Sequence, residues 1–179
     1  NIEIIGTDIC EEVLEKAKAG LYSQFEVQRG LPIQMLVKYF QQTGSMWQID
    51  SSIRSMVTYR HFNLLNDYAP LGTFDIVFCR NVLIYFDPPT KTDILSRISR
   101  RTRSGGYLVL GAAETVIGIS EDYKPVPDAR GLYALPDTPD GMAASLRSAA
   151  AAMGGGMATA DEETSATAAP SAASSIKLG

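Results

Sequence analysis

The chain has 179 residues and a formal net charge of −4, because 16 lysine and arginine residues stand against 20 aspartate and glutamate residues. Without a basic stripe, this balance argues against a nucleic-acid binder. No apolar run approaches the roughly 20 residues that span a bilayer, so no direct membrane insertion is expected. Cys10 and Cys79 have no metal-ligand spacing, and without a recognisable signal peptide they favour a reduced, cytoplasmic setting.

The composition divides the chain into a foldable part and a tail. Ala, Ser, Thr, Gly and Pro dominate residues 136–179, which carry too little apolar surface to offset the entropy of ordering them. We expect one domain over residues 1–135, followed by a disordered tail or linker over 136–179. Residues 145–153 of the tail favour a transient helix.

The first elements of the chain predict half of an α/β unit. The apolar run at residues 2–5 contains β-branched residues and favours a buried strand, after which Asp8 follows. Residues 10–20 favour a helix, because acidic residues lie in its first turn, lysines follow, and Gly20 marks a C-terminal stop.

A second helix and a group of short strands are predicted next. Residues 31–40 favour a helix with one apolar face, formed by Ile33, Leu36, Val37 and Phe40. The β-prone runs from Gly44 onward predict one or two small antiparallel strands. A further strand is expected over residues 57–62, ending at Asn63.

The rest of the foldable part predicts two buried strands, a helix and a hairpin. The strands are expected at residues 74–79 and 107–113, with a helix over 87–106 between them and a hairpin arm over 123–136. Strands that alternate with helices indicate the α/β class, in which a mostly parallel sheet is covered on both faces.

Polar residues follow four predicted strands, at the sheet edge where doubly wound sheets bind ligands. They are Asp8, Asn63, the pair Arg80-Asn81, and Glu114. Asp8 suits either ribose hydroxyls or a helix N-cap, and Asn63 suits either an adenine edge or a turn. Taken singly, Arg80 suits a surface charge, and Asn81 suits a turn.

The other polar and aromatic residues have simple structural interpretations. Tyr85 and Phe86, taken singly, are typical of a core, and His61, the one histidine, lies in a strand-like run. We recognise no nucleophile triad, metal cluster or phosphate-cradling loop in the sequence.

Taken together, several motifs resemble one family. "GTDI", "RGLP", "FNLL", "FDIVFCRNVLIYFD", "SGGYLVLGAAE" and "LYAL" occur in this order between about Ile2 and Leu135. This combination resembles the chemotaxis receptor methyltransferases, the CheR family, and "FCRNVLIYF" with an upstream "NLL" is its most specific part. The resemblance implies a Rossmann-like, S-adenosylmethionine-dependent methyltransferase sheet with a small antiparallel β-subdomain inserted at residues 44–60.

The resemblance also implies an activity and a set of residues. The enzyme would methylate glutamate side chains in the cytoplasmic helical domain of chemoreceptors, forming methyl esters. Tyr85 would lie near the transferred methyl group, where it positions or polarises. The residues implied for the cofactor are Asp8 for the ribose hydroxyls, Asn63 and Leu64 for the adenosine, and Arg80 and Asn81 for the pocket wall.

The family pattern also has parts that do not match this sequence. It places a helical domain, a first strand and a Gly-rich turn ahead of the matched region. We expect two neighbouring strands to lack a ladder partner without that first strand, so this chain alone would fold poorly or be inactive. The short insertion at residues 44–60 argues against docking of a receptor tail peptide.

Two other functions fit parts of the sequence. One is a methyltransferase-like binding module that holds a cofactor or receptor without turnover. The other is a nicotinamide-dependent dehydrogenase, which should carry a hydride-relay residue such as a Tyr-Lys pair at helical spacing. The pair Tyr123-Lys124 lacks that spacing.

Overall fold

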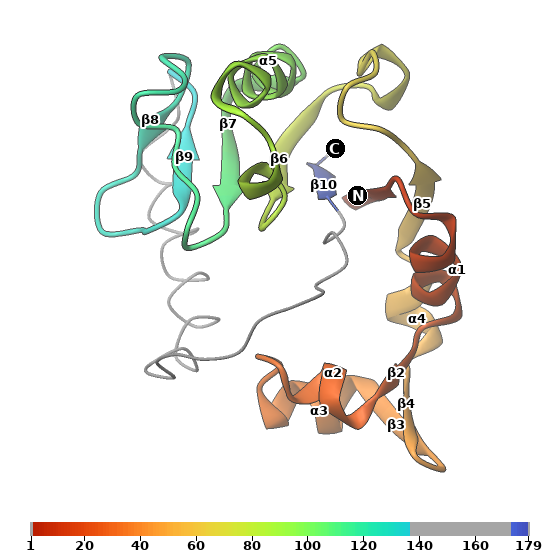
Figure 1. Ribbon diagram of the computed structural model, residues 1–179. Coiled ribbons are helices and arrows are strands. Elements are labelled where there is room, and N and C mark those ends of the chain that lie inside the picture. Colours follow the sequence, from red (N-terminus) through yellow and green to blue (C-terminus); the bar gives the residue numbers. More distant parts are fainter. Residues whose placement is uncertain (1, 137–172, 179) are drawn as a thin grey trace.

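The computed structural model describes residues 2–136 and 173–178 of the chain (Figure 1). A seven-stranded sheet has the order β5-β1-β10-β6-β7-β9-β8, and a three-stranded sheet has the order β2-β4-β3. The large sheet contains β1 (Ile2–Asp8), β5 (Val57–His61), β6 (Phe74–Cys79), β7 (Thr102–Leu110), β8 (Lys124–Pro125), β9 (Leu132–Ala134) and β10 (Ala173–Leu178). The small sheet contains β2 (Leu21–Ser23), β3 (Phe40–Thr43) and β4 (Met46–Ile49).

Helices cover and connect these sheets. The α-helices are α1 (Glu11–Ala19), α2 (Gln24–Gln28), α3 (Ile33–Tyr39), α4 (Ser51–Arg54) and α5 (Pro88–Ser99). Two short 3₁₀ turns are η1 (Ala69–Leu71) and η2 (Leu83–Tyr85). The predicted α/β class is confirmed, but the expectation of a mostly parallel sheet was wrong. The pairs β1–β5 and β6–β7 are parallel, whereas β10 and the β8–β9 hairpin add four antiparallel pairs.

The main core lies between the large sheet and α5. The apolar residues of this helix recur at helical spacing, so Ile94, Leu95 and Ile98 are buried against the sheet. The helix begins after Asp87, whose side chain accepts a hydrogen bond from the Thr90 backbone N–H at 3.0 Å. A well-capped helix with a fully buried face fixes the position of β6 and β7 beneath it.

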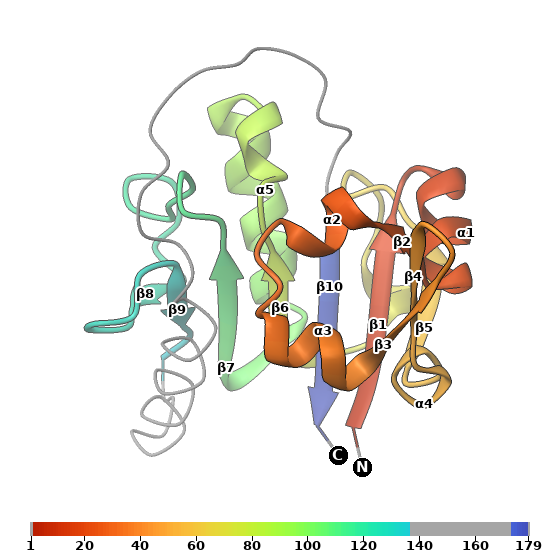
Figure 2. The ribbon, with the colours of Figure 1, turned by 90° about the horizontal axis from the view of Figure 1, so that it is seen from below.

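β10 lies between β1 and β6 and pairs antiparallel with both (Figure 2). Residues 173–178 thus form a strand within the region predicted to be a disordered tail. The expectation that two neighbouring strands lack a partner was also wrong, since β1 and β6 both pair with β10. The physical reason is that two facing strands present unpaired N–H and C=O groups, which an extended segment satisfies whatever its composition. The helix predicted at residues 145–153 lies outside the described residues.

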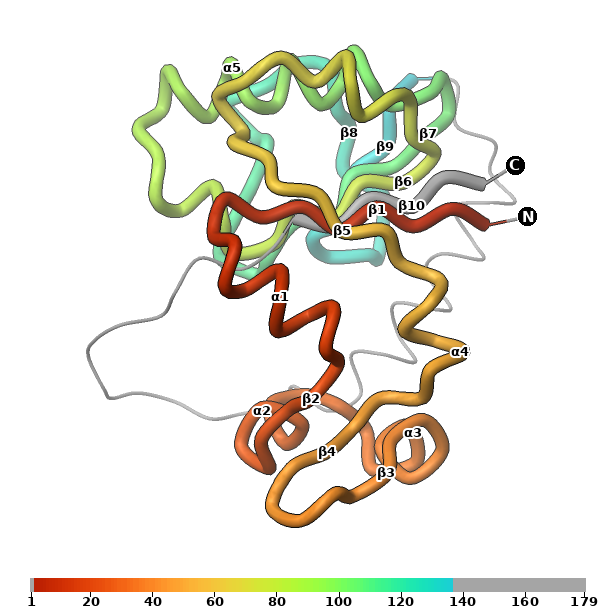
Figure 3. The backbone as a smooth tube through the Cα atoms, turned by 90° about the vertical axis from the view of Figure 1, so that its right-hand side faces the viewer, coloured from red at the N-terminus to blue at the C-terminus, as the bar shows by residue number. Residues whose placement is uncertain are grey.

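The small sheet stands apart from the large one and is joined to it through α1 and α4 (Figure 3). Gly20 ends α1 with a φ of 66°, and its N–H donates to the Lys16 carbonyl at 3.0 Å. The Gly20 carbonyl accepts hydrogen bonds from the Ile49 N–H at 2.9 Å and from Gln48 Nε2 at 3.0 Å. The end of α1 is therefore bonded directly to β4.

Two features of this region differ from the predictions. The small sheet runs from Leu21 to Ile49 rather than over residues 44–60, and Val57–His61 belongs to the large sheet. In α3, Leu36 is 4% exposed, whereas Ile33 and Val37 are 63% and 71% exposed. A short helix against a three-stranded sheet has little surface to pack on, so half of its predicted apolar face meets solvent.

None of the helices in the described residues combines the length and apolar character needed to cross a membrane.

Candidate functional site

Four parallel strands of the large sheet end at one edge. β1 is parallel to β5, β6 is parallel to β7, and β1 and β6 share a direction because each is antiparallel to β10. Ser174 pairs with Gly6 on one side and with Phe78 on the other. Asp8 and Arg80 each lie two residues after these partners, Gly6 and Phe78, so they are at the same level of the sheet. Because β10 separates them and adjacent strands are about 4.8 Å apart, their backbones are about 10 Å apart.

Asp8 carries a buried carboxylate at this edge. The residue is 5% exposed, and its Oδ1 accepts a hydrogen bond from the Cys10 N–H at 2.8 Å. Its Oδ2 is buried and has no hydrogen-bond partner. The N-cap of α1 is Cys10, so the N-cap interpretation of Asp8 is wrong. A buried carboxylate oxygen without a donor is costly, and a ligand hydroxyl would satisfy it.

Asn63 and Leu64 follow the neighbouring strand β5. The Phe62 N–H donates to the Asp8 carbonyl at 2.9 Å, so Asn63 is the first residue after this backbone hydrogen bond to β1. The Asn63 side chain accepts from the Leu65 N–H at 2.9 Å, which is the predicted turn role. Leu64 is half-buried against the main core.

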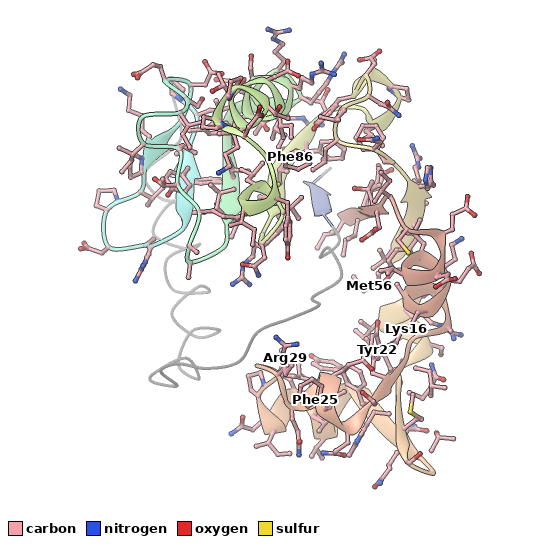
Figure 4. All side chains as sticks on the ribbon, viewed as in Figure 1. Lys16, Tyr22, Phe25, Arg29, Met56 and Phe86 are labelled. Atoms are coloured by element: carbon pink, nitrogen blue, oxygen red, sulfur yellow. The ribbon has the colours of Figure 1, made fainter. Side chains whose placement is uncertain are left out.

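Arg80, Asn81 and Tyr85 follow β6 and are exposed, Tyr85 at 57%. Asn81 has a φ of 58°, in the left-handed region that an asparagine tolerates better than most side chains. Phe86, in contrast, is partly buried against the main core, as the core interpretation expects. Figure 4 shows Phe86 in the large-sheet part of the molecule.

Glu114, given no role in the sequence-based prediction, is the buried acid of this edge. It is 8% exposed, and its carboxylate accepts four backbone hydrogen bonds, from Asn81, Val82, Leu83 and Gly111. Its place after a predicted strand was the available signal. Its partners could not be read from the sequence, because three of the four donors lie more than thirty positions away along the chain.

The buried thiol of Cys79, at the end of β6, is poorly ionised. Burial, and secondly the negative charge of Glu114, raises the pKa of Cys79 to about 12. Burial also raises the pKa of Tyr68 and of Tyr123. Within the described residues, no group of three or more His, Cys, Asp or Glu side chains could hold a metal ion. The polar groups at the edge are thus suited to hydrogen bonding and orientation.

The described residues enclose a small cavity and border an open hollow. One, of about 20 Å³, is lined mainly by apolar side chains under α5 and includes Leu64 and Cys79. That volume suits about one water molecule and is too small for a cofactor. The other is an open hollow beside the β8–β9 hairpin, around Asp128 and Arg130. Asp8, Asn63, Arg80, Asn81 and Tyr85 line neither cavity.

Residues 1–131 match the family model described as the CheR methyltransferase, SAM-binding domain. This chain belongs to the CheR methyltransferase family. The predicted family membership is confirmed, and the matched region of the CheR domain contains every residue that the sequence predicted for the site.

Curated relatives agree with this assignment. The chemotaxis protein methyltransferase Cher2 of Pseudomonas putida is 45% identical over 131 residues, which are 73% of this chain and 48% of that protein. Chemotaxis protein methyltransferase 1 of Pseudomonas aeruginosa is 44% identical over 132 residues, with coverage of 73% and 48%. The chemotaxis protein methyltransferase of Vibrio anguillarum is 38% identical over 127 residues, with coverage of 70% and 46%. This CheR-family chain spans about half the length of these relatives.

Proposed function

We propose that the protein containing this chain transfers a methyl group from S-adenosylmethionine to glutamate side chains of chemotaxis receptors. Family membership and the names of the relatives support this activity. The order of the large sheet and the separate small sheet also fit a Rossmann-like methyltransferase sheet with an inserted antiparallel subdomain. The methyl acceptors would be glutamates in the cytoplasmic helical domain of the receptors.

The observation that carries the cofactor proposal is the free oxygen of Asp8. Its Oδ2 is buried without a donor at the carboxyl edge of a parallel sheet, where the ligands of such sheets bind. The ribose of S-adenosylmethionine carries two hydroxyl groups that can donate to this atom. The residues present therefore fit the cofactor at this point.

The remaining residues have distinct roles in the proposal. Asn63 and Leu64 border the adenosine, with the Asn63 carboxamide oxygen bound to the Leu65 N–H and its NH₂ group left to face a ligand. Arg80 and Asn81 form the wall of the site on the far side of β10. Tyr85, exposed on η2, orients the incoming carboxylate.

The chemistry requires orientation more than acid–base catalysis. The bound cofactor supplies a methyl group that is already activated as a sulfonium. A glutamate with a pKa of about 4.3 is ionised at neutral pH, so no general base is needed. Alignment of two reactants can be worth roughly 7–11 kcal/mol of barrier. The residues of the edge can contribute that alignment through hydrogen bonds.

Radiolabel transfer from S-adenosylmethionine to receptor-containing membranes tests the proposal. The assay would compare this chain with the parent protein that carries the upstream part implied by the family pattern. We expect label that is released by alkali, as from a glutamyl ester, at least from the parent protein. Binding of S-adenosylhomocysteine without any transfer would favour the binding-module alternative, and binding of NAD instead would favour the dehydrogenase.

A further inference from the structure

The loops that follow β6 and β7 are joined by one side chain. Oε2 of Glu114 accepts from the N–H groups of Asn81 and Gly111, each at 2.7 Å. Oε1 accepts from the N–H groups of Val82 at 2.9 Å and Leu83 at 2.7 Å. Glu114 thus binds three consecutive amides of one loop and one amide of its own loop.

This contact sets the conformation of the loop after β6. Consecutive N–H groups converge on one point only when the backbone turns sharply, and Asn81 has the left-handed φ of 58° that begins this turn. Val82 and Leu83 are 7% and 2% exposed, so water does not replace the carboxylate as their acceptor. Without Glu114, the buried N–H groups of this loop would lack an acceptor, and the turn would lose the hydrogen bonds that hold it.

Gly111 gives the contact its close fit. A Cβ at this position would lie 2.4 Å from Oδ1 of Asn81 and 2.8 Å from Oε2 of Glu114. The Asn81 side chain therefore packs directly over Gly111 and beside the carboxylate. The position of the Asn81 amide depends on Glu114 through both the backbone and this packing.

Glu114 is poorly suited to contact a substrate itself. Both of its oxygens already accept two hydrogen bonds each from buried or half-buried backbone donors. A carboxylate held in this way has little remaining capacity to accept a proton or bind a ligand. Any effect on the reaction would act through the residues that it holds.

We propose that Glu114 is a positioning residue for the cofactor site, which holds Asn81 and its loop at the sheet edge level with Asp8. This inference rests on the proposed binding of S-adenosylmethionine at that edge. It gives a role to a buried acid that the proposed transfer of a methyl group does not itself need.

A double-mutant cycle tests the proposal. S-adenosylhomocysteine affinity would be measured by calorimetry in the parent protein and in the variants Glu114→Gln, Asn81→Ala and the pair. Glu114→Gln replaces one acceptor oxygen by a donor NH₂ group facing backbone N–H groups. We expect affinity to fall by roughly tenfold, the effect of one lost charge-assisted hydrogen bond. In the Asn81→Ala background, the same substitution should have little further effect.

The controls separate positioning from general stability. Glu121→Gln removes an exposed carboxylate from the same connection between β7 and β8 and should leave affinity unchanged. Hydrogen exchange should show faster exchange at the amides of residues 81–83 in Glu114→Gln while the melting transition remains cooperative. Two results would overturn the role of Glu114 but not the proposed cofactor. One is unchanged affinity in Glu114→Gln, and the other is a double variant whose loss of binding free energy equals the sum of the two single losses. Absence of binding by the unsubstituted protein would overturn the proposed cofactor and the inference with it.

Discussion

At the scale of single residues, the two carboxylate oxygens of Asp8 differ in their surroundings. One oxygen holds the turn into α1 through the Cys10 N–H, and the other is buried and free. We expect Asp8→Ala to weaken S-adenosylhomocysteine binding by tenfold to hundredfold, because a hydrogen bond to a charged group contributes about 1.5–3 kcal/mol. Calorimetry on the purified protein gives the affinity.

A matched control exists for this substitution. Asp67 holds the same kind of turn, since its Oδ1 accepts from the Ala69 N–H at 3.0 Å, and it is exposed. Asp67→Ala removes a turn contact without touching the sheet edge. Equal affinities for the two variants and the unsubstituted protein would reduce Asp8 to a turn residue.

Tyr85 should affect turnover more than cofactor affinity. Its exposed position on η2 leaves the hydroxyl free to meet an incoming carboxylate. We expect Tyr85→Phe to lower kcat by roughly tenfold, the effect of losing about 1.4 kcal/mol of transition-state stabilisation, with cofactor affinity nearly unchanged. Initial rates with receptor membranes provide the measurement, and Tyr39→Phe in the small-sheet part is the control. Equal kcat for both variants would show that the Tyr85 hydroxyl has no part in transfer.

The sequence was informative about these residues to different degrees. Asp8, Asn63 and Arg80 could be grouped from the sequence because parallel strands end at a common edge. The free oxygen of Asp8 could not, since burial and the absence of a donor depend on the packing of α1 and β5 around it. Glu114 shows the same limit, because its partners come from a loop distant in sequence.

At the scale of elements, local signals predicted the helices and strands more closely than their grouping. Gly20 marked the end of α1, and β6 was predicted at its observed residues. The start of α5 was also predicted, but its end was wrong, because α5 ends at Ser99 and the two glycines expected to stop it lie in β7. The small sheet was placed too late because β2, a strand of three residues, has no pattern long enough to detect. It becomes a strand only by pairing with β4.

The short helix α2 depends on a capping box. Ser23 and Glu26 exchange hydrogen bonds across its first turn, and Lys16 also binds the Glu26 carboxylate. The Lys16 hydrogen bond, followed by those from Ser23, lowers the pKa of Glu26 to about 2. Because the folded-state pKa is depressed, this contribution is complete above the ordinary carboxylate pKa and is lost as pH falls toward 2.

Glu26→Gln should therefore destabilise the protein in a pH-dependent way. We expect a loss of less than about 1 kcal/mol at pH 7, since the carboxylate is partly exposed and the ion pair is screened. The difference from the unsubstituted protein should shrink below about pH 4.5. Chemical denaturation at several pH values measures it, with Glu121→Gln as the control. A difference that stays constant down to pH 3 would contradict the depressed pKa.

At the scale of the whole molecule, the continuity of the large sheet depends on β10. This strand joins the half with β1 and β5 to the half with β6 and β7. We expect Ile176→Pro to lower Tm, because proline removes a backbone N–H at a position that pairs with Ile4 and Ile76. The shift should be about 2–4 °C for each kcal/mol lost in a chain of this length.

Ile176→Val keeps the N–H and is the matched control for the proline variant. Calorimetric melting, with light scattering to follow aggregation, compares the two. More aggregation is expected for Ile176→Pro. Weaker pairing of β10 would leave backbone N–H and C=O groups of β1 and β6 unpaired, and such groups can pair with another chain. Identical melting curves for both variants would mean that β10 adds no stability to the sheet.

The hydrogen bonds at the end of α1, around Gly20, determine which substitutions affect the attachment of the small sheet. The carbonyl oxygens of Ala19 and Gly20 accept hydrogen bonds from the Gln48 side chain of β4, and the Ala19 carbonyl also accepts one from the Arg54 side chain of α4. The exposed side chain of Phe25 in α2, with the Arg29 guanidinium over its ring, takes no part in these bonds (Figure 4). Substitutions of such exposed side chains therefore leave these bonds in place, whereas substitutions at Gly20, Gln48 or Arg54 would weaken the attachment of the small sheet to α1.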